Sequence, residues 1–139
     1  MSDNNEGLAH ILVVDDDKMI ARALTLGLEQ EGYNVTSAHS SQEAIASAES
    51  EHPALVILDY SLPDEDGVSA LRRLRQLPWA ADLPVIIASN VYDVDIINAI
   101  MTLGVQDYVL KNDVKIEDIV ALVGKYVPSP GATSVEAGD

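Results

Sequence analysis

The sequence predicts a three-layer α/β protein, with one parallel sheet between helices on its two faces. Short apolar runs alternate regularly with longer amphipathic stretches, which is the pattern of repeated strand–helix–strand units. Such units give a parallel sheet with right-handed crossovers. The length of 139 residues is that of one ordinary domain, and the hydrophobic and charged fractions, 47% and 22%, are close to globular averages. We therefore expect one doubly wound domain.

Five short apolar runs are the expected strands. They cover residues 10–15, 34–38, 54–59, 83–89 and 106–111. The first, third and fourth runs are almost continuous stretches of Val, Ile and Leu, as expected for parallel strands that are covered on both faces. Helices are therefore expected on both sides of the sheet.

The five stretches that follow the strands have the spacing of amphipathic helices. They cover residues 18–31, 41–51, 67–77, 92–103 and 115–126. Apolar residues recur at intervals of three or four, as in Ile20, Leu24 and Leu28, in Val68, Leu71 and Leu74, and in Ile116, Ile119, Val120 and Val123. Gly32 and Gly104 follow the first and fourth stretches as helix stops. Ser40 and Glu43 have the spacing of a capping box at the start of the second stretch.

The fourth helical stretch is unusually aliphatic. Its apolar residues are Val91, Val94, Ile96, Ile97, Ile100 and Met101, and not all of them can face the sheet. One interpretation is that this helix is simply well buried. The other is that its outer edge forms a surface for a partner or a second copy, together with strand 106–111 and helix 115–126.

Polar and charged side chains stand where the predicted strands end. The first strand ends in Asp15, Asp16 and Asp17, the third in Asp59, the fourth in Ser89 and Asn90, and the fifth in Lys111. In open parallel sheets, ligands bind beyond the carboxyl ends of the strands. Crowded carboxylates repel each other unless a cation is present, and Mg²⁺ prefers such oxygen ligands. We expect a site for Mg²⁺, or for Mn²⁺, at this edge.

This set of groups also suits phosphoryl chemistry. A carboxylate beside a metal ion can attack phosphorus and form an aspartyl-phosphate, whose oxygens then need positive charge and hydrogen-bond donors. Taken singly, each group has an ordinary explanation: an acidic triplet is usually a solvated turn or a helix N-terminus, and a single Ser is usually a cap. Their coincidence on one edge favours a metal and phosphoryl site.

The chain is strongly acidic, with 8 Lys and Arg against 23 Asp and Glu and a net charge of −15. This charge argues against direct nucleic-acid binding and against docking on an anionic membrane. Seven acidic residues fall at or beside the predicted site, and we assign this share to a cation site rather than to solubility. They are Asp15, Asp16, Asp17, Asp59, Asp64, Glu65 and Asp66.

The ends of the chain differ from its centre in composition. Residues 1–8 are polar, and residues 128–139 are rich in Pro, Gly, Ser and Ala, so we expect a flexible tail at the N-terminus and a flexible tail or truncated linker at the C-terminus around a domain over 9–127. The sequence has no cysteine, no secretory signal and no apolar run of membrane-spanning length. We expect a cytoplasmic protein.

Four motifs together resemble the receiver domain of two-component response regulators. They are ILVVDDD at 11–17, LVILDYSLPDEDG at 55–67, PVIIAS at 84–89 and DYVLK at 107–111, and their spacing agrees over about residues 10–126. The resemblance implies a flavodoxin-like receiver fold with strand order 2-1-3-4-5. It also implies a signalling switch rather than an enzyme, although such a domain would catalyse its own phosphorylation and dephosphorylation.

The resemblance further implies roles for individual residues. Asp59 would be the phosphoacceptor and a metal ligand. Asp16 would bind Mg²⁺ directly, Asp15 would assist, and the backbone carbonyl of Ser61 would complete the protein ligands. Lys111 would pair first with Asp59 and then with the phosphoryl oxygens.

The switch itself would involve two further residues. Ser89 would move toward the phosphoryl group, and Tyr108 would turn inward to fill the space. Asn90 stands where the family usually has a smaller residue, so it would either hinder or position the water that attacks the phosphoryl group. Asn112 replaces the family's usual proline, and we expect a trans bond there because a cis bond before a non-proline residue costs about 2.5–4 kcal/mol. Asp17 is expected to cap a helix.

The implied partners are a sensor histidine kinase or phosphotransfer protein that donates the phosphoryl group, and a downstream output protein or domain. Two alternatives stay open. A haloacid-dehalogenase-like phosphatase would place its nucleophile within the acidic triplet after the first strand and would make Asp59 dispensable. A pseudo-receiver would be an interaction module that never accepts phosphate.

Overall fold

The computed structural model describes residues 8–128, and the structural statements below concern these residues. Strands and helices alternate as predicted, with ends within two residues of the expected bounds. The elements are β1 (His10–Val14), α1 (Lys18–Gln30), β2 (Asn34–Ala38), α2 (Ser41–Glu51), β3 (Leu55–Leu58), α3 (Gly67–Arg75), β4 (Val85–Ser89), α4 (Val94–Met101), β5 (Asp107–Leu110), the 3₁₀ turn η2 (Lys111–Asp113) and α5 (Ile116–Tyr126). The expected tails fall largely outside the described residues.

The five strands form one parallel sheet in the order β2-β1-β3-β4-β5, which confirms the predicted topology. The order reverses at β1, because β2 lies on one side of it and β3 on the other. Val14 is level with Leu58 across the β1–β3 pair, so the residues that follow these two strands leave the sheet side by side. This is the switch point at which open sheets bind their ligands.

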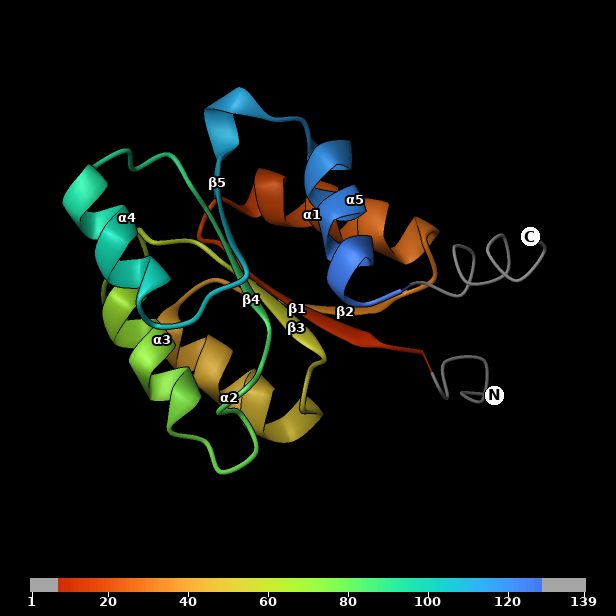
Figure 1. Ribbon diagram of the computed structural model, residues 1–139. Coiled ribbons are helices and arrows are strands. Elements are labelled where there is room, and N and C mark those ends of the chain that lie inside the picture. Colours follow the sequence, from red (N-terminus) through yellow and green to blue (C-terminus); the bar gives the residue numbers. More distant parts are fainter. Residues whose placement is uncertain (1–7, 129–139) are drawn as a thin grey trace.

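Helices cover both faces of the sheet, which gives the three predicted layers (Figure 1). α2, α3 and α4 pack on one face with a core that includes Leu12 and Val14 of β1. α1 and α5 pack on the other face with a core that includes Ile11 and Val13. Successive residues of β1 thus enter opposite cores, as alternate side chains of a strand must, and this accounts for its continuous run of apolar residues.

The predicted helix stops and caps are present, with one difference. Gly32 and Gly104 adopt φ angles of 98° and 81°, a region that favours glycine. The hydroxyl of Ser40 accepts a hydrogen bond from the backbone N–H of Glu43 at 3.1 Å. The carboxylate of Glu43, however, accepts from the N–H of His39 at 2.8 Å rather than from that of Ser40, so the capping box is only half formed.

The interpretation of the fourth helix as well buried is wrong. Within α4 only Ile100 is buried, whereas Val94 and Met101 are 60% and 43% exposed. Tyr92, just before the helix, is also exposed. A helix of eight residues that lies at the end of the sheet beside β5 turns only one side toward the core, where Ile96 packs partly buried, so Val94 and Met101 stay at the surface.

The segment after β5 agrees with the expected trans bond at Asn112. The described residues contain no cis peptide bond, and Lys111–Asp113 form a short 3₁₀ turn instead. Within residues 8–128, no helix is long and apolar enough to cross a membrane.

Candidate functional site

Two buried carboxylates lie side by side at the carboxyl edge of the sheet. Asp15 and Asp59 directly follow β1 and β3, and they are only 2% and 4% exposed. Their backbone N–H groups continue the sheet ladder, because Asp15 donates to the carbonyl of Ala38 at 3.0 Å and Asp59 donates to that of Val14 at 2.9 Å. The sheet therefore fixes the backbone of both residues independently of their side-chain contacts.

Lys111 joins these two carboxylates. Its Nζ donates to Asp15 Oδ2 at 2.8 Å and to Asp59 Oδ2 at 3.0 Å. The lysine follows β5, two strands away from β3, so three strand ends meet at one ammonium group. Buried carboxylates need such a partner, since an unpaired charge in the interior is strongly unfavourable.

Burial and pairing shift the pKa values in this cluster. Burial raises the pKa of Asp15, although its hydrogen bond to Lys111 acts in the opposite direction. Burial also lowers the pKa of Lys111, but the hydrogen bonds to Asp15 and Asp59 outweigh it and the net shift is upward. Lys111 is thus held as a cation between two carboxylates, one of which ionises less readily than usual.

A third carboxylate completes an oxygen-rich site. Asp15, Asp16 and Asp59 each offer an oxygen, and these oxygens all lie within 4.8 Å of one another. Asp16 is exposed, so the cluster is open to solvent on one side. The donor set fits Mg²⁺ or Mn²⁺, because hard cations take carboxylate oxygens and Mg²⁺ retains several waters.

Two neighbouring backbone groups orient the buried carboxylates. The N–H of Asp17 donates to Asp15 Oδ1 at 2.9 Å, and the N–H of Ser61 donates to Asp59 Oδ1 at 3.0 Å. Asp17 itself caps α1, with its carboxylate accepting from Met19 and Ile20, which confirms the capping role expected for it. Each buried carboxylate therefore uses one oxygen for the backbone and the other for Lys111.

The hydroxyl and aromatic residues expected at the site lie on β4 and β5. Ser89 is buried at the end of β4 and accepts a hydrogen bond from the N–H of Val91 at 3.3 Å. The Tyr108 hydroxyl donates to the carbonyl of the same Val91 at 2.5 Å, and burial raises its pKa. Asn90, between Ser89 and Val91, is exposed.

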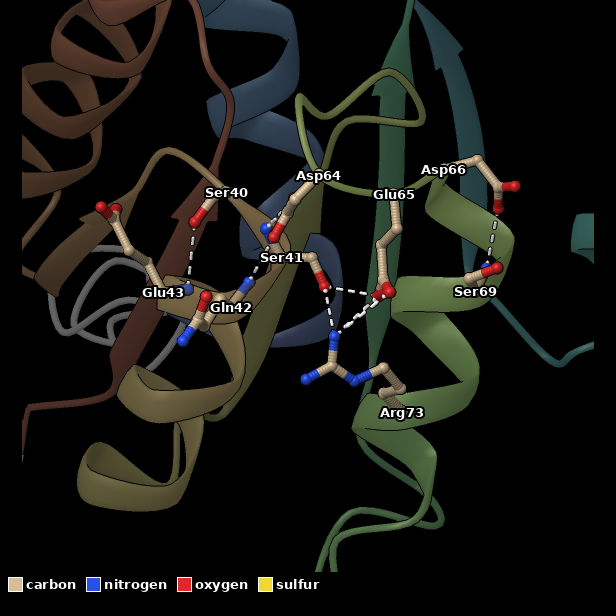
Figure 2. A network of polar contacts seen from close by, with 9 residues as sticks. All are labelled: Ser40, Ser41, Gln42, Glu43, Asp64, Glu65, Asp66, Ser69 and Arg73. Carbon is tan, nitrogen blue, oxygen red and sulfur yellow. Dashed lines mark hydrogen bonds and ion pairs between the residues drawn. The ribbon is translucent and has the colours of Figure 1, made fainter.

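The assignment of seven acidic residues to a cation site is wrong for those that lie in the loop after β3. Figure 2 shows Asp64, Glu65 and Asp66 turned toward α2 and α3. Asp64 accepts from the backbone N–H groups of Ser41 and Gln42, and Asp66 accepts from that of Ser69. These carboxylates satisfy helix N-termini, where negative charge is favourable, and Asp17 does the same for α1.

Two residues in this network had no signal in the sequence. Ser41 is fully buried, and its hydroxyl donates to Glu65 Oε2 at 2.5 Å. Arg73, on α3, pairs with the same carboxylate at 3.1 Å and also reaches the Ser41 hydroxyl at 3.2 Å (Figure 2). Ser41 and Arg73 are 32 residues apart, so only the fold brings them together.

Comparisons with known proteins agree with this geometry. Residues 11–123 match the family model described as "Response regulator receiver domain". The chain is 35% identical over 128 residues to "Probable transcriptional regulatory protein TcrX" of Mycobacterium tuberculosis, covering 92% of this chain and 53% of that protein. It is 34% identical over 119 residues to "Two-component response regulator ORR8" of Oryza sativa, covering 85% of this chain and 97% of that one. It thus spans about half the length of TcrX but nearly all of ORR8.

Solved structures give the same result. The crystal structure of a response regulator receiver domain protein (CheY-like) from Methanospirillum hungatei superposes with a TM-score of 0.79 at 28% identity. That match covers 86% of this chain and 93% of the other. The similarity therefore extends over the whole described fold.

Proposed function

The chain belongs to the response regulator receiver domain family, and on that premise we propose that it is a phosphorylation-controlled switch whose phosphoacceptor is Asp59. The observation that carries the proposal is the contact of Lys111 with both Asp15 and Asp59, beside the three clustered carboxylate oxygens. Receiver domains belong to two-component signal transduction. We propose a switch that acts in the cytoplasm and is not an enzyme with a separate substrate.

In the proposed transfer, an Asp59 carboxylate oxygen attacks the phosphorus of a phosphohistidine on a partner protein. The phosphorus–nitrogen bond breaks, the histidine nitrogen leaves with the electron pair and takes up a proton, and an aspartyl-phosphate remains on Asp59. Asp15, Asp16, Asp59 and the Ser61 carbonyl would hold Mg²⁺ or Mn²⁺, which when bound supplies positive charge for the phosphoryl oxygens.

Lys111 supplies the second positive charge. Before transfer it pairs with Asp59 and Asp15, and afterwards its ammonium pairs with a phosphoryl oxygen in a charge-assisted hydrogen bond. The N–H of Ser61, at 3.0 Å from Asp59 Oδ1, holds the carboxylate in one orientation. A fixed nucleophile and a fixed cation need little reorganisation as charge develops.

The switch then runs through Ser89 and Tyr108. Both side chains contact the backbone of Val91, the first through its N–H and the second through its carbonyl. A Ser89 hydroxyl that turned to a phosphoryl oxygen would release the Val91 N–H and so change the segment that leads into α4. This shared residue supports a coupling between the phosphoryl site and the exposed α4 surface.

The partners follow from the family. A sensor histidine kinase or phosphotransfer protein donates the phosphoryl group, and an output protein or domain reads the result. TcrX is described as a probable transcriptional regulatory protein, and the match covers 53% of its length. The exposed side chains Tyr92, Val94 and Met101 support α4, β5 and α5 as the output or homodimer surface.

The test is the intact mass of the protein after incubation with acetyl phosphate, with and without Mg²⁺. We expect a Mg²⁺-dependent phosphate adduct on the parent and none on Asp59→Asn. An adduct that persists on Asp59→Asn would favour a nucleophile within the triplet Asp15–Asp17, as in haloacid-dehalogenase-like phosphatases. No adduct on the parent under any condition would favour a pseudo-receiver.

A further inference from the structure

The loop that follows the phosphoacceptor strand is held in place by polar contacts with the neighbouring helices α2 and α3. Residues 59–66 connect β3 to α3, and Ser61, Pro63 and Asp64 are exposed. The apolar contacts of this loop with the core come from Tyr60 and Leu62, which are only partly buried. Few apolar contacts leave the position of a loop dependent on its hydrogen bonds.

One of these contacts is made by Asp64 with α2. Both oxygens of its carboxylate are used, Oδ1 by the N–H of Ser41 at 2.9 Å and Oδ2 by the N–H of Gln42 at 3.0 Å. These two donors lower the pKa of Asp64, so the carboxylate is ionised at neutral pH. In Figure 2, Asp64 reaches from the loop to the first turn of α2.

α2 is a fixed support for this contact. Ser41, Ala44 and Ala48 are buried, and the two alanines belong to the core that covers one face of the sheet. A second contact runs parallel to the first, since Glu65 bonds to the hydroxyl of Ser41 and to Arg73. The loop is thus tied at two consecutive residues to an element that the core holds in place.

Further contacts connect this part of the loop to Asp59, the proposed phosphoacceptor. Ser61 and Asp66 form an isolated antiparallel bridge that closes the loop on itself. The N–H of Ser61 then bonds to Asp59 Oδ1 at 3.0 Å. An unbroken series of contacts therefore leads from α2 through the loop to the orientation of the Asp59 carboxylate.

We propose that Asp64 is a positioning residue for the cation site, because it ties the loop to α2 and so fixes where Ser61 presents its backbone to Asp59 and to the ion. This inference rests on the proposed function in assigning Asp59 and the Ser61 carbonyl to the ion. Groups that orient metal ligands from outside commonly change metal affinity by about 10–100-fold. Asp64 acts through an exposed loop, so the expected effect is smaller, about threefold to tenfold.

The experiment measures Mn²⁺ binding directly, from the paramagnetic resonance signal of free Mn²⁺, without any phosphodonor. We expect Asp64→Ala to raise the dissociation constant about threefold to tenfold, and Asp64→Asn to raise it less, since its amide oxygen still accepts one of the two hydrogen bonds. Both variants lose the same charge, so the difference between them reports geometry rather than the electric field.

Two control variants reproduce the other effects of Asp64→Ala, which are the loss of a helix cap and the loss of a negative charge. Ser40→Ala removes a different cap from α2, one that accepts its hydrogen bond from Glu43, and Asp93→Ala removes an equal charge and a cap from α4, outside the loop and α2. Both are expected to stay within about twofold of the parent, well below the range for residues that orient a ligand. Circular dichroism checks that each variant is folded.

The outcomes test the positioning role of Asp64 separately from the proposed role of Asp59 as phosphoacceptor. Equal weakening by Asp64→Ala, Asp64→Asn and Asp93→Ala, or no weakening at all, overturns the positioning role even if the parent still accepts phosphate. Graded weakening in the expected order supports it even if acetyl phosphate leaves no adduct on the parent, a result that would count against the phosphoacceptor proposal alone. A parent that binds no Mn²⁺ overturns the inference.

Discussion

At the scale of single residues, Asp15 shows that a buried carboxylate can work against stability. Its carboxylate is buried, and burial raises its pKa, so ionisation at neutral pH is less favourable in the folded protein than in the unfolded chain. A group of this kind stabilises the fold most below its unfolded pKa, and that contribution is lost as the pH rises through the folded pKa. A hard cation offsets the same penalty.

Asp15→Asn is therefore expected to stabilise the protein in the absence of divalent cations. At pH 7 in a chelator, we expect the free energy of unfolding to rise, because the amide carries no ionisation penalty and Lys111 keeps Asp59 as its partner. The gain should shrink as the pH falls toward the unfolded pKa, since the parent carboxyl then takes up its proton. Urea unfolding at several pH values measures both effects. A stability gain of Asp15→Asn that grows as the pH falls would contradict the upward shift of the Asp15 pKa.

Asn90 is the second residue with a specific expectation. It is exposed beside the buried Ser89, where its side chain can obstruct the approach of water to a phosphoryl group on Asp59. We expect Asn90→Ala to shorten the lifetime of the aspartyl-phosphate about threefold or more, which corresponds to a barrier lowered by about 0.7 kcal/mol. Loss of the mass adduct with time measures the lifetime. An unchanged rate would remove Asn90 from the mechanism, and slower loss would show that it positions the water.

At the scale of elements, two helical glycines differ in what surrounds them. A Cβ at Gly67, the first residue of α3, would lie 2.6 Å from the backbone Cα of Tyr60, which is too close for any side chain. A Cβ at Gly124 in α5 would meet only the Tyr33 hydroxyl, at 3.7 Å. Gly67 thus lets α3 begin against the loop that leaves β3.

Gly67→Ala is expected to lower the free energy of unfolding by about 1–3 kcal/mol, the range for overpacking a buried position. Gly124→Ala is the matched control, and we expect it to raise stability by about 0.5–1 kcal/mol, because alanine is the better residue inside a helix. Guanidinium unfolding measures both. Similar losses in the two variants would show that the contact with Tyr60 is not the cause.

At the scale of the whole molecule, the net charge of −15 is divided between distinct roles. Asp17, Asp64 and Asp66 cap helices, while Asp15, Asp16 and Asp59 gather at one edge of the sheet. Only the second group has the mutual spacing of a cation site. A divalent ion that binds there should stabilise the whole fold, since it binds the native state alone.

We therefore expect Mg²⁺ to raise the midpoint of thermal unfolding more than NaCl of equal ionic strength. When the Mg²⁺ concentration is about ten times its dissociation constant, binding to the native state adds about 1.4 kcal/mol to the free energy of unfolding. For a domain of this size, that raises the midpoint by roughly 4–7 °C. Asp16→Asn should lose most of this increment while leaving the midpoint without Mg²⁺ nearly unchanged, because Asp16 is exposed. Calorimetry measures the midpoints. An equal Mg²⁺ increment in Asp16→Asn would place the ion elsewhere.

The local features of this protein were predictable because their causes are local. Continuous Val, Ile and Leu runs, helical spacing and the stops at Gly32 and Gly104 identified the elements to within two residues. The acidic residues after β1 and β3 and the lysine after β5 were correctly expected to share one edge, because parallel strands end on the same side. The burial of α4 was not predictable, since it depends on how far the sheet extends beneath that helix.

By itself, the sequence determined the order of the elements, the parallel sheet and the residues that stand at each strand end, because periodicity and helix stops act over a few residues. The tertiary structure decided which acidic residues face a cation and which satisfy a helix. Asp59 and Asp64 are close in the chain, yet one pairs with Lys111 and the other with the backbone of α2. The physical reason is that a carboxylate binds whichever donors meet it in space, and those donors come from distant parts of the chain.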